Sequence, residues 1–151
     1  MKTYLLYLLT GFLLISNGCV PAANKKITIR ALEFNSGKLK VVTSYANEKL
    51  NIMSTLYGNE SALKYSIKGD HGHVAGEVFK LATFEQQDHE LWYGSKINGA
   101  LLRVETIRTV QQKEGITPLY TIEYYGTAKP DQPDKNARIK FILEQKASLF
   151  P

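Results

Sequence analysis

Cysteine is nearly absent from this chain, which has 151 residues and a single cysteine, Cys19. One cysteine cannot form a disulfide within the chain, so no disulfide framework stabilises the fold. An unpaired thiol in an oxidising compartment is either a liability or the site of a modification. The fold must therefore be held together by its hydrophobic core.

The sequence also lacks an apolar run long enough to span a bilayer, which needs about 20 residues. Its main apolar segment, residues 4–15, follows Lys2 and matches the apolar region of a signal peptide, which is roughly 7–15 residues long. Small or polar residues follow, ending at Cys19. This arrangement predicts an export signal and places the protein in the periplasm or cell envelope.

The position of Cys19 predicts a lipid anchor. Gly18 before Cys19 resembles a bacterial lipobox, in which the signal is cut before the cysteine and the thiol becomes a thioether to diacylglycerol. The usual pattern has an aliphatic residue where this chain has Ser16. Ordinary cleavage after Ala22 or Ala23, and an uncleaved anchor, are the alternatives.

These signals divide the chain into three parts. We expect a signal peptide at residues 1–18, a tether at residues 19–26 and a single domain at residues 27–151. No internal repeat, linker or low-complexity tract divides the domain further. A domain of this length can bury an adequate core without cross-links.

The formal net charge is +5, and the basic residues are scattered along the chain. Such a charge outside the cell fits a solvated surface beside anionic lipid better than a nucleic-acid partner. The expected partner is therefore the membrane, through a lipid on Cys19. A small ligand or an envelope protein is a further partner that the sequence does not identify.

Familiar catalytic motifs are missing as well. The chain contains no G-x-S-x-G, no Walker loop and no H-E-x-x-H. A Ser-His-Asp triad assembles in space and leaves no local motif, so the sequence does not exclude one, yet nothing indicates one. These absences favour a non-catalytic protein.

Apolar alternation and helical spacing predict an antiparallel sheet with two helices. Strands are expected at residues 27–34, 39–45, 50–56, 78–84, 101–110 and 119–125. Helices are expected at residues 60–68, after the N-cap Asn59, and at residues 135–149. A long connection is expected at residues 86–99, and a turn between Gly115 and Pro118. The expected class is α+β, with about five antiparallel strands and two helices.

Three sequence blocks resemble the cytochrome P-460-like domain family. The first is Leu50–Glu60, which ends in Tyr-Gly-Asn-Glu, and the second is Gly76–Gly94, which contains His-Glu-Leu-Trp-Tyr-Gly. The third, Ala137–Gln145, is similar to the tail of members that lack haem. The blocks extend over most of residues 39–151, so the resemblance implies that this fold covers the expected domain.

The resemblance also implies a haem that this chain cannot attach in the usual way. Members of the family are exported c-type cytochromes that oxidise hydroxylamine, with haem attached through Cys-x-x-Cys-His and bonded to a lysine. One cysteine excludes that attachment. Lys80 lies one residue out of register with the cross-linking lysine, whose place is taken by Leu81, and one residue on a strand is the opposite face. Lys80 is then expected to be a solvated strand lysine.

Residues 70–73, Asp-His-Gly-His, are a candidate zinc or copper site through His71 and His73. The two imidazoles converge only if Gly72 folds the backbone favourably. Zinc usually takes a third protein ligand, and His89 is the only other histidine. The alternative is a solvated polar turn between a helix and a strand.

Aromatic residues provide a last candidate site. Trp92 and Tyr124, together with Lys80, are predicted to line a ligand pocket. Aromatic side chains in a sheet more often pack in the core, where their polar tips find partners. Both interpretations remain open at the level of the sequence.

Two functional hypotheses follow. In the first, the protein is an envelope lipoprotein that lacks covalent haem, needs no cofactor and binds a small apolar or haem-like ligand or a partner protein. In the second, it is a redox or metal-dependent enzyme that holds haem or a metal without covalent bonds. The first is favoured because no catalytic constellation is visible.

Overall fold

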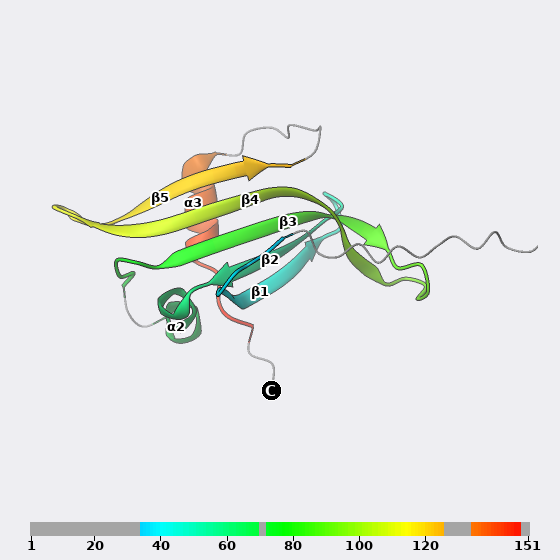
Figure 1. Ribbon diagram of the computed structural model, residues 1–151, viewed down its shortest axis with the longest axis horizontal. Coiled ribbons are helices and arrows are strands. Elements are labelled where there is room, and N and C mark those ends of the chain that lie inside the picture. The colour runs from blue at the N-terminus through cyan, green and yellow to red at the C-terminus, as the bar shows by residue number, and fades with distance from the viewer. Residues whose placement is uncertain (1–33, 70–71, 126–133, 149–151) are drawn as a thin grey trace, which may run out of the picture. The chain divides into compact units, whose positions relative to one another are not determined.

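The computed structural model of the chain describes residues 34–69, 72–125 and 134–148. Contacts divide the chain into Met1–Ala31 and Leu32–Pro151, and every described residue belongs to the second unit. Its strands are β1 (Lys40–Asn47), β2 (Ile52–Gly58), β3 (Val78–Asp88), β4 (Lys96–Gln112) and β5 (Gly115–Tyr124). Its helices are α2 (Glu60–Lys68) and α3 (Lys135–Leu143) (Figure 1).

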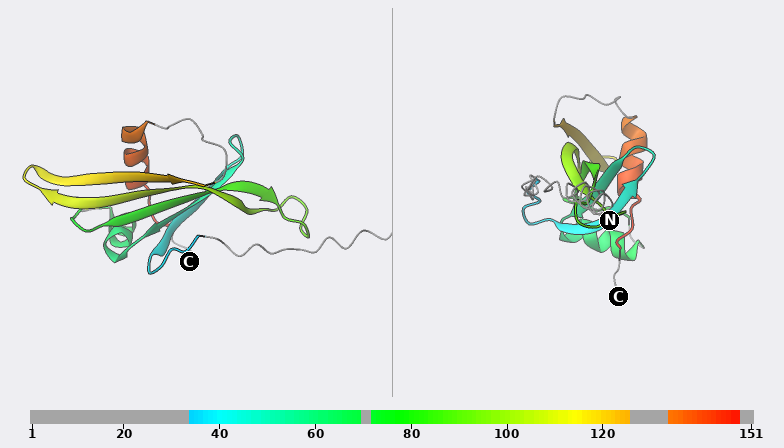
Figure 2. Two further views of the ribbon diagram at one scale, coloured as in Figure 1. Left: turned by 45° about the horizontal axis from the view of Figure 1, so that its top comes forward. Right: turned by 90° about the vertical axis from the view of Figure 1, so that its right-hand side faces the viewer.

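The five strands form one sheet in the order β1-β2-β3-β4-β5, and each pairs antiparallel with the next (Figure 1). Both described helices lie on one face of this sheet (Figure 2). Neither of them is both long enough and apolar enough to cross a membrane. The sheet therefore carries both described helices on the same face.

The expected class, α+β, is wrong. Strands take up 50% of the described residues and helices 17%, which fits a mainly-β fold with a couple of helices. One reason is that α3 ends at Leu143, six positions before the expected end. The residues beyond it bond to other elements instead, since the Ala147 amide donates to the Ser66 carbonyl and the Ser148 amide donates to the Val42 carbonyl.

Two expected connections are also wrong. Residues 86–88 pair with residues 96–98, so β3 and β4 continue into the segment expected to be a long connection, which shrinks to His89–Ser95. The turn between β4 and β5 precedes Gly115, and Pro118 lies within β5 opposite Thr109. A proline is tolerated there because β5 is an edge strand. The strand expected at residues 27–34 lies outside the described residues, except for Phe34.

Each face of the sheet carries its own apolar cluster. The larger one joins the sheet to both helices and consists of Val42, Leu56, Ala62, Phe79, Leu81, Ile107 and Ile142. The smaller one, on the other face, consists of Tyr57, Ala82, Phe84, Leu101 and Val104, with Phe34 and Leu39 packed against it. Because successive residues of a strand point to opposite faces, the alternation in β2, β3 and β4 supplies both clusters.

Candidate functional site: a buried carboxylate cluster beneath helix α3

Glu105 lies on β4 with its side chain completely buried. It is level with Leu81 on β3 and Ile122 on β5, so strand alternation directs it into the face covered by the helices. A buried carboxylate needs compensating partners because desolvation of a charge is costly. Any function of this face must therefore accommodate a negative charge in the core.

Arg138 on α3 is the main partner of that charge. Its Nε donates to Glu105 Oε1 at 2.7 Å, and its Nη2 donates to Oε2 at 2.6 Å. The Tyr120 hydroxyl donates to Oε1 at 2.8 Å, and Arg103 Nε donates to Oε2 at 3.3 Å. The two-pronged pairing with Arg138 is the strongest geometry available to a carboxylate. We call these four residues the Glu105 cluster.

Burial would raise the pKa of Glu105, but the hydrogen bonds and charge of Arg138, helped by Tyr120 and Arg103, hold that pKa below its ordinary value. Burial raises the pKa of Tyr120, and the neighbouring carboxylate raises it further. The cluster thus contains an ionised carboxylate, a neutral tyrosine and two guanidinium groups. The formal charge of the cluster is positive, which favours a hydrogen-bond acceptor or an anion at its margin.

Tyr124 lies at that margin. It is the register partner of Arg103, and it shares a face with Tyr120, four residues earlier on β5. Its hydroxyl oxygen is buried and has no hydrogen-bond partner in the part of the chain that the structure describes. Tyr45 on β1 packs against Phe141 of α3, with ring centroids 5.7 Å apart. Tyr124 is therefore a polar group with an unmade bond beside a positive cluster.

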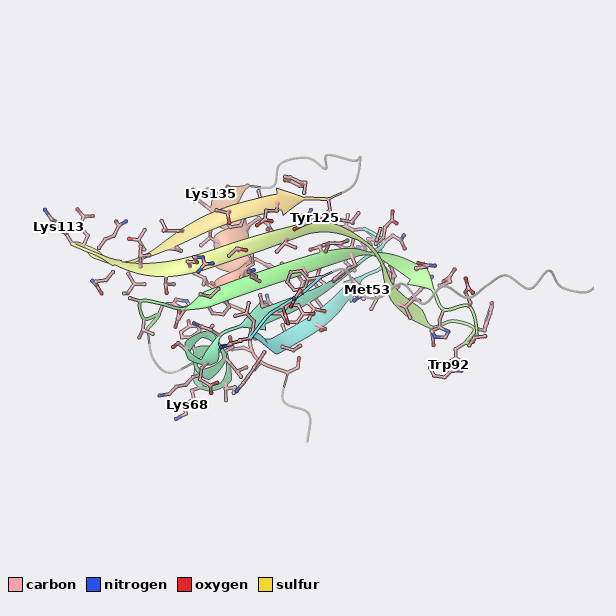
Figure 3. All side chains as sticks on the ribbon, viewed as in Figure 1. Met53, Lys68, Trp92, Lys113, Tyr125 and Lys135 are labelled. Carbon is pink, nitrogen blue, oxygen red and sulfur yellow. The ribbon has the colours of Figure 1, made fainter. Side chains whose placement is uncertain are left out.

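The three side chains predicted to line a pocket are not brought together. Lys80 is level with Tyr57 and Thr106 on the face opposite the Glu105 cluster. Trp92 lies in the connection between β3 and β4 and is exposed (Figure 3). Of the three, Tyr124 alone borders the cluster.

Glu105, Arg103 and Arg138 were missed by sequence reasoning. A weak signal existed in the sequence. Arg103, Glu105 and Ile107 occupy every second position of a strand and so share one face, which places two charged residues beside a core residue. The sequence does not show that Arg138, 33 positions away, supplies the opposite charge. Finding the site required the packing of α3 on the sheet.

Of the two predicted metal ligands, the structure describes His73. His73 Nδ1 lies 2.7 Å from Oε2 of the buried Glu77, and its ring packs on Tyr65 with centroids 3.9 Å apart. His71 lies outside the described residues, as does Cys19. His73 precedes β3 and His89 directly follows it, so the length of the strand separates the two histidines. Within the described ranges, no three His, Cys, Asp or Glu side chains are grouped to hold a metal.

The covalent haem of the cytochrome P-460-like family does not fit the residues present. Attachment through Cys-x-x-Cys-His needs two cysteines, and the chain has Cys19 alone. Leu81, which takes the place of the cross-linking lysine, is fully buried in the core. Lys80 lies on the opposite face of the sheet. Neither position supplies an amine to a group bound beneath the helices.

Comparison with known proteins leaves the family open. No family model matches the chain, and no curated protein matches it. The resemblance to the cytochrome P-460-like family therefore rests on its three sequence blocks.

Proposed function

We propose that this protein is a non-catalytic binding module of the cell envelope, exported by residues 1–18 and held at a membrane by a lipid on Cys19. In this proposal residues 27–151 form a cytochrome P-460-like domain without covalent haem. The ligand is a small molecule with an apolar body and an acidic group. It binds at the margin of the Glu105 cluster, against Tyr124.

The buried hydroxyl of Tyr124 is the observation that carries this proposal. Leaving a buried hydroxyl unpaired costs about 1–3 kcal/mol, and such a group in a folded protein calls for an explanation. An acceptor atom of a ligand would satisfy it. Arg103, its register partner, would meet the charge of an acidic group.

The state of Glu105 supports binding over catalysis. A general base needs a lone pair within reach of the proton that it abstracts. Both oxygens of Glu105 already accept hydrogen bonds from Arg138, and the side chain is completely buried. This carboxylate is better suited to orient two arginines than to exchange protons with a substrate.

Benzoate, an aromatic carboxylate, and hemin, which carries two carboxylates on an apolar ring, are suitable probes. We expect both to bind the wild-type protein, followed by NMR shifts for benzoate and by visible absorbance for hemin. Tyr124→Phe should weaken benzoate binding by about fivefold, the value of roughly one hydrogen bond. The unliganded variant should be at least as stable as wild type, because the Tyr124 hydroxyl forms no hydrogen bond with the residues that the structure describes.

Tyr125→Phe is the matched control. The neighbouring Tyr125 is exposed and donates to Glu123 on the other face of β5, so its removal should leave binding unchanged. The proposal fails if neither probe binds the wild-type protein, or if Tyr125→Phe weakens benzoate binding as much as Tyr124→Phe does. It also fails if Tyr124→Phe destabilises the unliganded protein.

A further inference from the structure

The hairpin of β3 and β4 ends in three consecutive exposed apolar side chains, Leu91, Trp92 and Tyr93. Their exposed fractions are 67%, 68% and 108%. They lie at the end of the sheet opposite the turn that contains Lys113 (Figure 3). We call them the tip triad. A contiguous patch of large apolar side chains marks an interaction surface, whereas single exposed residues need no explanation.

The backbone around the tip triad is paired within the hairpin itself. The His89 amide donates to the Ser95 carbonyl at 2.9 Å, and the Ser95 amide donates to the Trp92 carbonyl at 3.1 Å. The amides of Leu91 and Trp92 both donate to His89 Nδ1, at 3.1 and 3.2 Å. Backbone groups that enter lipid must be satisfied internally, since no water remains to bond them. The tip meets that condition for these four donors.

The imidazole of His89 also stacks on the indole of Trp92, with centroids 4.9 Å apart and planes 13° from parallel. Trp92 is thereby held at the end of the hairpin. Tryptophan and tyrosine are the residues that favour the level of lipid headgroups, where an apolar ring and a polar tip are both accommodated. The chemistry of the tip triad therefore fits the interface of a bilayer.

The described chain starts on the face of the sheet that carries the smaller cluster. Phe34 packs on Tyr57, with ring centroids 5.2 Å apart, in the cluster that also contains Phe84 and Leu101. The roughly 15 residues from Cys19 to Phe34 reach at most about 50 Å when extended. Tyr57 pairs with Lys80, and the chain from Lys80 to Trp92 spans at most about 43 Å when extended. A lipid on Cys19 and the tip triad can thus reach the same membrane.

We propose that Leu91, Trp92 and Tyr93 enter the interface of the membrane to which Cys19 is anchored. This inference rests on the proposed lipid anchor. The lipid supplies affinity, and the tip triad adds a second point of contact that orients the sheet relative to the membrane. The two acyl chains of a diacylglycerol already give stable attachment, so the contribution of the tip triad is to fix the orientation of the sheet at the surface.

Trp92 is the only tryptophan of the chain, so its fluorescence reports directly on the tip. The test uses the Cys19→Ser protein with a hexahistidine segment after the signal peptide, bound to vesicles that contain nickel-chelating lipid. We expect a blue shift of the emission and quenching by lipids with a nitroxide near the headgroup. Wild-type lipidated protein in the same vesicles should behave alike.

The double variant Leu91→Ser/Tyr93→Ser should lose most of the shift and quenching. Val74→Ser is the control, because Val74 is exposed and precedes the other end of β3. The charged residues beside the triad are Asp88, Glu90 and Lys96, whose charges nearly balance, so the shift should persist in vesicles of phosphatidylcholine without anionic lipid. A strict requirement for anionic lipid would contradict apolar insertion.

Two further results would overturn the inference. One is unchanged, unquenched emission from the nickel-tethered protein. The other is a blue shift that grows with protein concentration in the absence of vesicles, which would show that a second copy covers the triad. The nickel tether replaces the lipid, so it tests insertion of the tip triad without the proposed anchor. Fatty-acid labelling of Cys19 tests the anchor independently.

Discussion

Glu105 shows how a single ionised residue can organise one face of a sheet. Its carboxylate takes two hydrogen bonds from Arg138 on α3 and one from Tyr120 on β5. Each partner belongs to a different element, so the residue connects β4 to both. At the scale of one residue, the cost of burying a charge is offset by the quality of its pairing.

Glu105→Gln should destabilise the fold strongly. The amide has the shape of the carboxylate but no charge, so the mostly covered Arg138 loses its counter-charge, at a cost of up to about 3–5 kcal/mol. Urea unfolding measures this. Glu60→Gln is the control, since Glu60 pairs with Lys40 at the exposed surface, and its unfolding midpoint should be unchanged. Equal stabilities for the two variants would contradict the role assigned to the cluster.

The same variant should change the acid limb of stability. The folded chain has the lower pKa at Glu105, so on acidification the unfolded chain takes up the proton first. The stabilisation is present above the unfolded pKa of about 4.3 and is lost as the pH falls below it towards the lower folded pKa. Urea titrations at a series of pH values measure this. As the pH falls below 5, the free energy of unfolding of Glu105→Gln should therefore decrease less steeply than that of wild type.

The start of α2 is the best example of local control at the scale of an element. Asn59 Oδ1 accepts from the Ala62 amide at 3.1 Å and from the Val78 amide at 3.2 Å, and its Nδ2 donates to the Gly76 carbonyl at 2.8 Å. Gly69 ends the helix with φ of 64°, a left-handed conformation that favours glycine. One side chain thus caps the helix and ties it to β3.

Asn59→Ala should cost more than the loss of an ordinary cap. A helix cap alone contributes about 1 kcal/mol, and here the bonds to Val78 and Gly76 are lost as well, so we expect about 2 kcal/mol from urea unfolding. Asp134→Ala is the matched control, because Asp134 caps α3 through a single exposed bond to the Asn136 amide. A smaller loss for Asn59→Ala than for Asp134→Ala would contradict this account.

The second helix shows why boundaries are harder to predict than elements. The apolar spacing after Lys135 predicts a helix to residue 149, but α3 ends at Leu143. Ala147 still packs on the main cluster, yet its amide bonds to Ser66 on α2. The helical spacing of the apolar residues cannot by itself distinguish a helix that ends at residue 143 from one that ends at residue 149, because an irregular segment can bury apolar side chains as well. The choice depends on hydrogen-bond partners that are distant in the sequence.

At the scale of the whole molecule, the described unit carries two separate candidate sites, one buried and one exposed. The Glu105 cluster lies between the sheet and α3, whereas the tip triad stands at the end of the β3–β4 hairpin (Figure 1). Trp92 and Tyr124 were grouped as one pocket by sequence reasoning, and the structure separates them because one lies in a connection and the other in an edge strand. Ligand binding and membrane contact can therefore be tested independently.

The lipid anchor is a prediction about the protein as a whole. Wild-type protein should incorporate radioactive fatty acid and fractionate with membranes. Cys19→Ser should abolish both, because the chain has no other thiol to carry the lipid. Labelling that persists in Cys19→Ser would contradict the anchor and favour ordinary secretion or an uncleaved signal.

Local patterns were enough to locate α2 and the segments that form β1 to β5, and a single cysteine was enough to exclude a disulfide within the chain and haem attached through two cysteines. Helix caps and strand alternation depend on residues close together in the sequence, so the sequence alone predicts them. The pairing of Glu105 with Arg138, the end of α3 and the exposed place of Trp92 could not. Each depends on contacts between residues far apart in the chain, which exist only once the sheet has packed against its helices.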